Sequence, residues 1–419
     1  MPHVVVIGAG AAGLLAAWQA AREGARVTLL EKNNQCGRKI RVSGSGRCNL
    51  TNAAPLDDFV GAYFGQGRFL YPSFRHFFRP ELIALLAQRG VAVKTEPNGK
   101  VFPVSDRAAD VAEALEASCR AAGVQIRLDE PVKKLMVGAA GLEGVVSNRE
   151  TYPARAALIA CGGSSWPGTG STGDGFRLAA QAGHPLTSLR PALVPLTCAE
   201  SWPARLSGVS CPSVDVRLVA DRRLVARTRG DLLFTHTGLS GPAVLRVSRD
   251  YLPQADSEMW QLLINLLPDL PQADVLATIR EACRAQPRHL LYNALSRAFP
   301  ALPRALLASL TGLAGIPGNR PAGQVSSRQQ TELAAFLQQL TLTVSGTRGY
   351  REAMVTAGGV RLDTVDPRTL MSRLVPGLFL AGEVLDIDGD TGGYNLQAAF
   401  STGSLAGFSA ARYVQALPG

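Results

Sequence analysis

The first thirty-one residues of this chain hold the pattern that most restricts its fold. Val4–Ile7 is an apolar run typical of a buried parallel strand, and Leu14–Arg22 has the periodicity of a helix. A second apolar run, Val27–Leu30, ends on the acid Glu31. A strand, a helix and a second strand in this order predict a βαβ unit, which opens a doubly wound α/β domain.

Three glycines join the first strand to the helix, and each meets a different physical demand. Gly8, Gly10 and Gly13 have the G-x-G-x-x-G spacing. The first allows a tight turn, the second lets backbone N–H groups approach a pyrophosphate, and the third lets the helix pack closely on the strand. Glu31 can accept hydrogen bonds from a ribose 2′-hydroxyl and would repel a 2′-phosphate. The pattern therefore predicts a dinucleotide site in preference to a glycine-rich turn without a ligand.

The segment Lys32–Asn52 is polar and rich in glycine, so the sequence predicts a functional loop rather than a helix or a strand. Arg38 and Lys39 would lie near the charge of an adenosine diphosphate. Cys48 follows Arg47, which would favour a thiolate, so a reactive or proton-donating thiol is one interpretation. The other interpretation is a small buried side chain beside the cofactor.

Two later stretches place glycines where a cofactor would approach. A predicted strand at 157–161 runs into paired glycines that begin at Gly162 and a hydroxyl-rich loop at 164–175. Near the end of the chain, Leu378–Glu383 predicts another strand, and Gly393 opens a final helix. Backbone N–H groups at that helix start can stabilise negative charge on a ligand. Both ends of the chain are therefore expected to build one domain.

The middle of the chain has a different pattern. Several segments alternate like strands up to Gln261–Leu267, which is expected to be the last of them, and short helices with proline breaks follow. His236 lies in a glycine-punctuated turn, where it is either a loop histidine or a catalytic acid or substrate ligand. The predicted organisation is a nucleotide-binding domain from 1–190 and 346–419, a β-rich insert from 191–270, and a helical insert from 271–345.

The composition argues against several classes of protein. The 419-residue chain carries a formal net charge of +10 without a basic block, a surface that tolerates a polyanion. Its seven cysteines are odd in number and form no C-x-x-C pair, which argues against a metal site and for a reducing cytoplasm. No apolar run reaches membrane-spanning length, and the chain starts with its first strand, so neither a membrane partner nor a signal peptide is expected.

Over nearly its whole length the chain resembles the BaiN/RdsA-type (YhiN-like) family of NAD(P)/FAD-dependent oxidoreductases. The motifs that carry the resemblance are GAGAAG, CGRKIRVSGSGRCNLTN, GGSSWPGTGSTGDG, LLFTHTGLSGPAVL, VTAGGV and AGEVLDIDGDTGGYNLQAAFSTG. The resemblance implies a two-dinucleotide-type, Rossmann-like FAD domain interrupted by a β-barrel-like insert and a helical insert. It implies that FAD is held by Gly8, Gly10, Gly13, Glu31, Lys32, Arg38, Val132, Gly162, Gly382, Glu383, Gly393, Tyr394 and Asn395.

The resemblance also implies an activity. Members of the family have been linked to reduction of a uridine in large-subunit (23S) ribosomal RNA to dihydrouridine, with NADH or NADPH as the electron donor. The alternatives are a small-molecule flavin reductase or amine oxidase of the same fold, and a flavin-binding module without turnover. Reduction of the uracil C5=C6 bond needs a hydride at C6 and a proton at C5. Cys48 is the first candidate for the acid and His236 the second.

Overall fold

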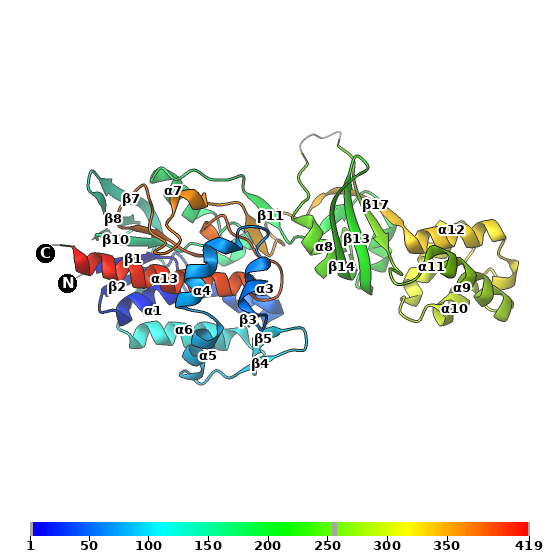
Figure 1. Cartoon of the computed structure of the whole chain (residues 1–419), viewed down its shortest axis with the longest axis horizontal. Coiled ribbons are helices and arrows are strands. Elements are labelled where there is room, and N and C mark those ends of the chain that lie inside the picture. The colour runs from blue at the N-terminus through cyan, green and yellow to red at the C-terminus, as the bar shows by residue number, and fades with distance from the viewer. Residues whose placement is uncertain (1–2, 254–257, 418–419) are drawn as a thin grey trace. The chain divides into compact units, whose positions relative to one another are not determined.

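The computed structural model describes residues 3–253 and 258–417, and the chain divides into two compact units (Figure 1). Unit 1 comprises Met1–Pro191 and Met354–Gly419, and unit 2 comprises Ala192–Ala353. The chain thus returns to unit 1 later than the expected residue 346. The physical reason is that a strand running to Thr347 stays hydrogen-bonded within unit 2.

A five-stranded parallel sheet forms the centre of unit 1. Its strand order is β19-β10-β1-β2-β6, and every neighbouring pair is parallel. Val4 and Val6 on β1 point into one apolar cluster, whereas Val5 and Ile7 point into another. Both faces of the sheet are therefore covered, which explains why its strands are continuously apolar. The strands are β1 (His3–Ile7), β2 (Arg26–Leu30), β6 (Gln125–Arg127), β10 (Ala156–Ile159) and β19 (Leu378–Leu380).

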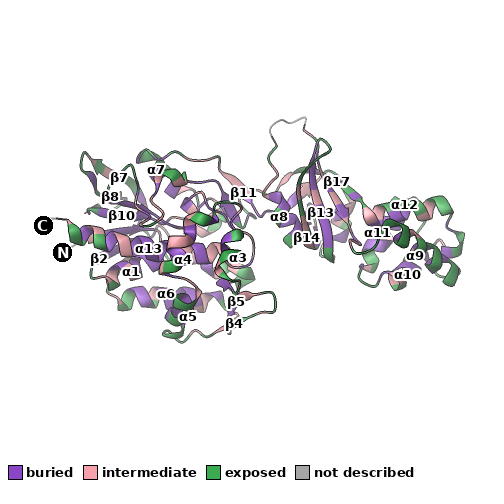
Figure 2. Ribbon diagram, in the orientation of Figure 1, coloured by how far each residue is buried: buried purple, intermediate pink, exposed green. Residues whose placement is uncertain are grey.

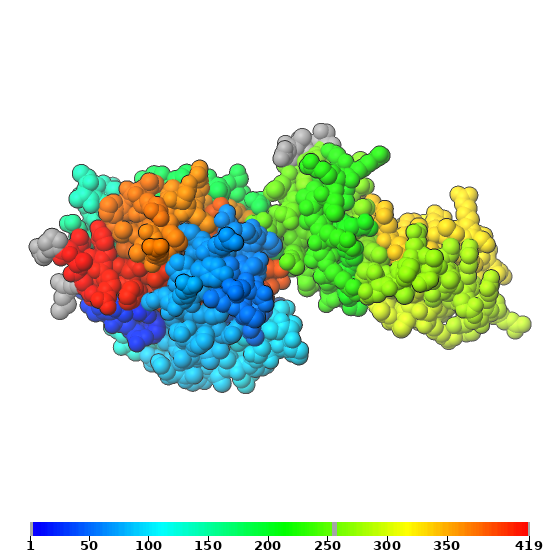
Figure 3. All heavy atoms as spheres, in the orientation of Figure 1, coloured from blue at the N-terminus to red at the C-terminus, as the bar shows by residue number. Residues whose placement is uncertain are grey.

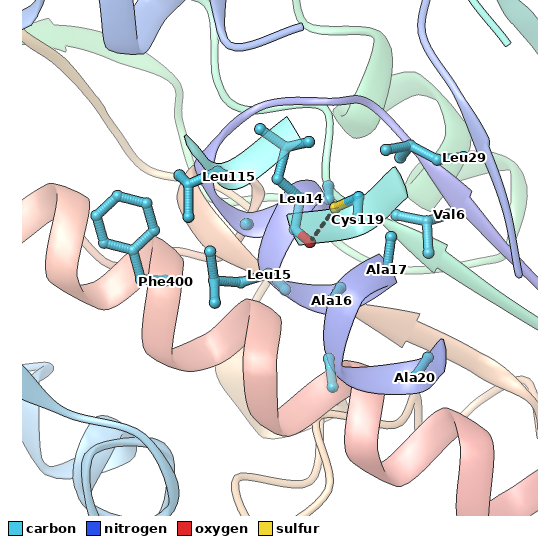
Figure 4. Packing of buried hydrophobic residues seen from close by; sticks show 14 of the residues in the cluster. Val6, Leu14, Leu15, Ala16, Ala17, Ala20, Leu29, Leu115, Cys119 and Phe400 are labelled. Atoms are coloured by element: carbon cyan, nitrogen blue, oxygen red, sulfur yellow. Dashed lines mark hydrogen bonds between the residues drawn. The ribbon is translucent and has the colours of Figure 1, made fainter. Parts of the chain in front are cut away.

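Two helices from opposite ends of the chain pack against each other on one face of this sheet. They are α1 (Ala11–Arg22) and α13 (Tyr394–Ala416). A Cβ atom on Gly407 would lie 2.2 Å from the carbonyl oxygen of Ala16, so the two backbones touch where side chains are absent. Figure 4 shows the apolar layer beneath this crossing, with Leu15 and Phe400 facing each other. Figure 3 shows the blue and red segments from the two ends of the chain side by side on the surface of unit 1.

Smaller elements surround the sheet. An antiparallel sheet of β7, β8 and β9 covers the other face, and a second antiparallel sheet has the order β3-β5-β4. The expected loop at 32–52 instead contains a short helix, because Ile40 turns into the apolar cluster under α1 and α6. The remaining elements are α2 (Arg38–Val42), β3 (Thr51–Asn52), α3 (Leu56–Gly61), α4 (Tyr71–His76), α5 (Arg79–Ala87), β4 (Val93–Thr95), β5 (Lys100–Pro103), α6 (Ala108–Ala121), β7 (Val132–Gly138), β8 (Gly141–Ser147), β9 (Thr151–Pro153), α7 (Asp174–Gln181), and the paired strands β11 (Arg190–Ala192) and β18 (Val355–Ala357).

Unit 2 contains a closed six-stranded barrel with the strand order β12-β15-β14-β13-β16-β17. The prediction that the segment at 261–267 is the last strand was wrong. Strand β17 follows the helical insert and closes the barrel between β16 and β12. The predicted division had placed the residues of this strand in the helical insert and the nucleotide-binding domain. The elements are β12 (Leu196–Cys198), β13 (Ser210–Ala220), β14 (Arg223–Thr235), β15 (Gly238–Ser240), α8 (Pro242–Ser248), β16 (Trp260–Asn265) and β17 (Leu340–Thr347).

Four helices lie between β16 and β17 and share one apolar cluster with the barrel. Each helix buries one face, as Val275, Ile279 and Cys283 do on α9, and exposes the other (Figure 2). Their exposed faces are polar, with Leu313 the large apolar side chain that remains exposed on them. The helices are α9 (Gln272–Ala285), α10 (Leu291–Ala298), α11 (Arg304–Leu313) and α12 (Ser327–Gln338).

A buried histidine ties the end of α7 to a distant loop in unit 1. The Nδ1 atom of His184 lies 2.8 Å from the Oγ1 atom of Thr364, and its Nε2 atom lies 2.8 Å from the Oγ atom of Ser372. Burial lowers the pKa of this imidazole below its usual value of 6.5. His184 therefore binds a proton less readily in the folded protein than in the unfolded chain.

This linkage predicts a loss of stability in acid. As the pH falls below about 6.5, the unfolded state binds a proton first, so the free energy of unfolding falls by up to about 1.4 kcal/mol per pH unit until the folded pKa is reached. His184→Gln should flatten this part of the profile, as measured by urea denaturation between pH 7.5 and 5. His289→Gln, at an exposed position, is the matched control and should leave the profile unchanged. Burial also lowers the pKa values of His3 and His76, which should contribute to the slope that remains.

Candidate functional site

The carboxyl ends of four parallel strands meet at one edge of the central sheet. Strand β1 runs into Gly8, β2 into Glu31, β10 into Gly162 and β19 into Gly382. Strands β2 and β10 lie on opposite sides of β1, so the connections that follow β1 and β10 run to opposite sides of the sheet. Ligands of open α/β sheets bind in the crevice at such a switch point.

The three glycines of the first turn differ in their surroundings. A Cβ atom on Gly13 would lie 1.8 Å from the carbonyl oxygen of Gly8, and one on Gly8 would lie 2.7 Å from that of Ala160. Both glycines are therefore required by close backbone packing. A Cβ atom on Gly10, in contrast, would meet nothing within 4 Å. The start of α1 thus opens onto free space, and no side chain caps its N–H groups.

Glu31 is buried and tied to this turn. Its Oε2 atom accepts a hydrogen bond from the backbone N–H of Ala9 at 2.7 Å. Its Oε1 atom accepts hydrogen bonds from the backbone N–H of Asn33 at 2.9 Å and from the Asn33 side chain at 2.6 Å. The carboxylate is therefore held at a fixed place beside the glycine turn, where it retains capacity to accept a hydrogen bond from a hydroxyl group.

Lys32 and Arg38, both expected to help hold the cofactor, contact the loop after β10. The Nζ atom of Lys32 donates hydrogen bonds to Thr172 and Asp174, at 2.6 Å each. Arg38 donates to the side-chain oxygen of Asn33 at 2.9 Å and to the carbonyl oxygen of Gly168 at 3.1 Å. These contacts hold the loop over the end of β2.

A second carboxylate, Glu383, lies in a polar cluster after β19. Its Oε2 atom is 2.7 Å from the Nζ atom of Lys39, and its Oε1 atom accepts hydrogen bonds from Ser165 Oγ and Thr356 N–H, at 2.8 Å each. Burial by itself would raise the pKa of Glu383, but the charge and hydrogen bond of Lys39, with Ser165 and Thr356, hold it below its usual range. Glu383 is therefore ionised, and its negative charge is paired with Lys39.

Sequence reasoning did not assign Lys39, Ser165 and Thr356 to this cluster. Each lies in a motif that stood out, but the three come from segments far apart in the chain. One general rule could have linked Glu383 to Lys39: a buried carboxylate needs a cation nearby.

The start of α13 forms the opposite end of the edge. Gly393 has φ +97°, and a Cβ atom there would lie 2.3 Å from the carbonyl oxygen of Thr51. The Asn49 side chain accepts a hydrogen bond from the Gly393 N–H at 3.0 Å and donates one to Thr51 at 3.1 Å. Two of the residues expected to hold the cofactor make contacts at this turn. Asn395 hydrogen-bonds the backbone of Gly389 at 2.8 Å and 2.7 Å, and Tyr394 packs edge-on against Phe59.

Three further expected residues lie on β7 or shortly after the ends of β10 and β19. Val132 is buried on β7, and its carbonyl oxygen accepts a 3.4 Å hydrogen bond from Arg177. Gly162 has φ +70°, and a Cβ atom there would lie 3.2 Å from the Oγ atom of Ser171. Gly382 also has a left-handed backbone, with φ +77°, and its N–H donates to Thr402 at 3.0 Å.

Cys48 is fully buried in the apolar cluster under α1. Burial raises the pKa of its thiol to about 12, against an opposing hydrogen bond with Ser43. Arg47 turns away from the thiol: its guanidinium stacks on Phe102 at 4.1 Å and pairs with acidic side chains. A thiol that is enclosed and protonated in this way favours the packing interpretation.

We therefore expect Cys48→Ala to leave turnover per bound flavin close to that of the unchanged protein. Loss of a buried sulfur atom should lower the free energy of unfolding by about 1–2 kcal/mol. Single-turnover assays with the bound flavin quantified, together with urea denaturation, measure both quantities. A hundredfold fall in turnover per flavin would return the acid role to Cys48.

His236 lies at the tip of the β14–β15 hairpin in unit 2 and is exposed. It is therefore on a different unit from the glycine turn and the Glu383 cluster.

Among residues 3–253 and 258–417, no group of three or more His, Cys, Asp or Glu side chains is arranged to hold a metal ion. In the same residues, no helix combines the length and the apolar character needed to cross a membrane.

The free space at Gly10, the uncapped start of α1 and the fixed carboxylate of Glu31 fit a dinucleotide with a free ribose hydroxyl. Comparison with known families agrees with this geometry. Residues 2–409 match the family described as "HI0933-like protein Rossmann domain". The chain belongs to this HI0933-like family. Its membership confirms the resemblance seen in the motifs.

Three relatives of the HI0933-like chain match it over nearly their full length. It is 34% identical to a 3-dehydro-bile acid delta(4,6)-reductase of Clostridium scindens, over 98% of this chain and 99% of that protein. It is 36% identical to the ribosomal RNA dihydrouridine synthase of Escherichia coli, with 95% of each chain covered. The protein of the same name from Haemophilus influenzae is 33% identical, over 97% of this chain and 98% of that protein.

Solved structures support the fold of the HI0933-like chain. A 3-ketosteroid-delta4-(5alpha)-dehydrogenase from Rhodococcus jostii has a TM-score of 0.51 at 17% identity, over 98% of this chain and 97% of that one. A 3-ketosteroid delta1-dehydrogenase from Sterolibacterium denitrificans has a TM-score of 0.52 at 13% identity, over 98% and 100%. The expected α/β fold with a Rossmann-like sheet and a barrel is confirmed, and the protein is an FAD-dependent oxidoreductase.

Proposed function

We propose that this protein reduces the C5=C6 bond of a uridine in large-subunit ribosomal RNA, giving dihydrouridine. The observation that carries the proposal is the full-length identity of 36% and 33% to two ribosomal RNA dihydrouridine synthases. The formal net charge of +10 suits a polyanionic substrate. The balanced reaction consumes one uridine, one NADH or NADPH and one proton, and it would take place in the cytoplasm, where ribosomal RNA is found.

The residues at the sheet edge provide distinct contacts for FAD, which supplies two-electron reduction when bound. Backbone N–H groups at Gly10 and the start of α1 would hold the pyrophosphate, and Glu31 would accept a hydrogen bond from the adenosine ribose. Glu383, kept ionised by Lys39, would accept hydrogen bonds from hydroxyl groups of the chain that links pyrophosphate and flavin. The N-terminal end of α13 would stabilise negative charge at the flavin.

The proton for C5 must come from a side chain or a water molecule with access to substrate. Cys48 is enclosed and holds its proton tightly, whereas His236 has an exposed ring. His236, the second candidate from the sequence, is therefore the residue to test next. His236→Gln should reduce product formation by about a hundredfold and leave FAD content and NAD(P)H-driven flavin reduction unchanged. Cys48→Ala serves as its matched comparison, and equal product formation by His236→Gln would contradict a role as general acid.

A second candidate is reduction of a small unsaturated ketone. Its support is the 34% identity to a bile acid reductase over the same span of the chain. The names of both kinds of relative describe reduction of a carbon–carbon double bond, so one arrangement of cofactor could serve either substrate. The two candidates differ in the size and charge of what must reach the flavin.

Purified holoenzyme offered both substrates separates the candidates. One reaction contains 23S ribosomal RNA that lacks dihydrouridine, with mass mapping of the product, and the other contains a 3-oxo-4,6-diene steroid. We expect dihydrouridine at one site in the RNA and negligible reduction of the steroid. Rapid steroid reduction without dihydrouridine would instead support the second candidate.

A further inference from the structure

A short segment between α9 and α10 gathers five arginines on the helical part of unit 2. This segment, Gln286–Tyr292, includes the first two residues of α10. It carries Arg288 and directly follows the last turn of α9, where Arg284 lies. We call the five residues the arginine cluster. Its members are Arg284, Arg288, Arg297, Arg304 and Arg320.

Three contacts bring the distant members to this segment. The Nη1 atom of Arg297, on α10, donates a hydrogen bond to the side chain of Gln286 at 2.6 Å. The guanidinium of Arg304, on α11, lies 5.1 Å from the ring centre of Tyr292. The backbone N–H of Leu291 donates to the carbonyl oxygen of Arg320 at 3.2 Å. Residues separated by up to 36 positions (320 − 284) are thus placed around one turn.

The cluster is exposed and its charge is not compensated. Arg284, Arg288, Arg297 and Arg304 are exposed, and Arg320 is half-buried. None of the five forms an ion pair with a residue in the described part of the chain. Residues 271–339 contain seven arginines and three acidic residues, a net charge of +4 (7 − 3). Because these positive charges are unpaired within the described residues, the exposed surface favours an anionic partner.

We propose that the arginine cluster binds the phosphodiester backbone of RNA, an inference that rests on the proposed function. The planar guanidinium groups present paired donors that match phosphate oxygens. Tyr292 and Arg304 add flat surfaces on which an unpaired base can stack. The exposed faces of α9 to α12 carry only one large apolar side chain, Leu313. They therefore lack the apolar surface that would insert into an anionic membrane. RNA is therefore the partner whose chemistry the cluster fits.

The test is binding of a fluorescent 23S ribosomal RNA fragment to FAD-loaded protein across a range of salt concentrations. The double variant Arg288→Gln/Arg297→Gln removes two charges from the cluster. The control Arg222→Gln/Arg223→Gln removes two exposed charges at the β13–β14 turn of the same unit. We expect the cluster variant to bind RNA about tenfold more weakly, with the salt slope smaller by about 0.7 for each phosphate that the protein no longer neutralises. The control variant should bind nearly as well as the unchanged protein.

Equal affinity of the cluster variant and the unchanged protein would overturn the inference, as would an equal loss in the control. Tight binding to anionic vesicles that depends on the cluster, with no binding of RNA, would also overturn it. FAD content and NAD(P)H-driven flavin reduction should be the same in all three proteins. Cluster-dependent RNA binding by a protein that forms no dihydrouridine would support the RNA surface while contradicting the proposed function.

Discussion

Gly10→Val is expected to yield a folded protein that has lost FAD. A Cβ atom at this position meets nothing within 4 Å, and its backbone angles, φ −83° and ψ −167°, suit a β-branched residue. The new side chain therefore does not disturb the protein itself. It occupies the free space at the start of α1 through which N–H groups would reach a pyrophosphate. Since each hydrogen bond to a charged group contributes about 1.5–3 kcal/mol, loss of two should weaken FAD binding by about 10³-fold.

The matched comparison is Gly13→Val, three residues further on. There the new Cβ atom would lie 1.8 Å from the carbonyl oxygen of Gly8, so the variant should fail to fold. Urea denaturation measures stability, and absorbance of flavin released from the purified protein measures FAD content. A Gly10→Val protein that keeps its FAD would contradict the position given to the pyrophosphate.

Gly407→Val is expected to disrupt unit 1 as a whole. A Cβ atom on Gly407 would lie 2.2 Å from the carbonyl oxygen of Ala16, and the one on Gly403 would lie 2.1 Å from that of Ala12. Because these positions are one turn apart on each helix, α1 and α13 touch along a line of backbone rather than at a point. A valine would force the helices apart and expose the apolar layer beneath them. We expect a loss of about 3 kcal/mol or more, a large part of the stability of an ordinary domain.

Ser409→Val provides the control on the same helix. Ser409 is half-buried and away from the two glycines, so the substitution adds the same side chain without the backbone contact. Its stability should remain within about 1 kcal/mol of the unchanged protein. Thermal unfolding followed by circular dichroism checks both variants, and equal stabilities would show that the helices can separate without cost.

Local pattern predicted the nucleotide-binding half of the fold well. The runs at Val4–Ile7, Leu14–Arg22 and Val27–Leu30 lie within β1, α1 and β2, because a buried parallel strand must be apolar on both faces. Failures occurred where distant pairing decides the structure. Nothing near β17 in the sequence shows that it closes a barrel whose other strands end at Asn265. The helix Arg38–Val42 has few apolar residues and forms because Ile40 finds a place in the core.

Prediction of the site follows the same division. The glycine turn and Glu31 lie close together in sequence, and their spacing alone indicates their roles. The partners of Glu383 come from Lys39, Ser165 and Thr356, so only the folded chain brings them together. Cys48 shows the limit of reading chemistry from a neighbour: Arg47 adjoins it in sequence but turns to Glu96 and Asp106.

The pairing of β10 with β19 has a consequence for how this protein is made. Ala157 lies beside Leu378 in the sheet, so the ribosome must synthesise all of unit 2 before the partner of β10 emerges. Unit 2 is continuous in sequence and can complete its barrel during translation, whereas the nascent unit 1 waits with an open strand edge. Such an edge attracts wrong pairing, which makes this interval the one in which a chaperone has most to protect. The glycine turn and Glu31 are likewise made before unit 2, whereas Gly382 and the start of α13 are made after it.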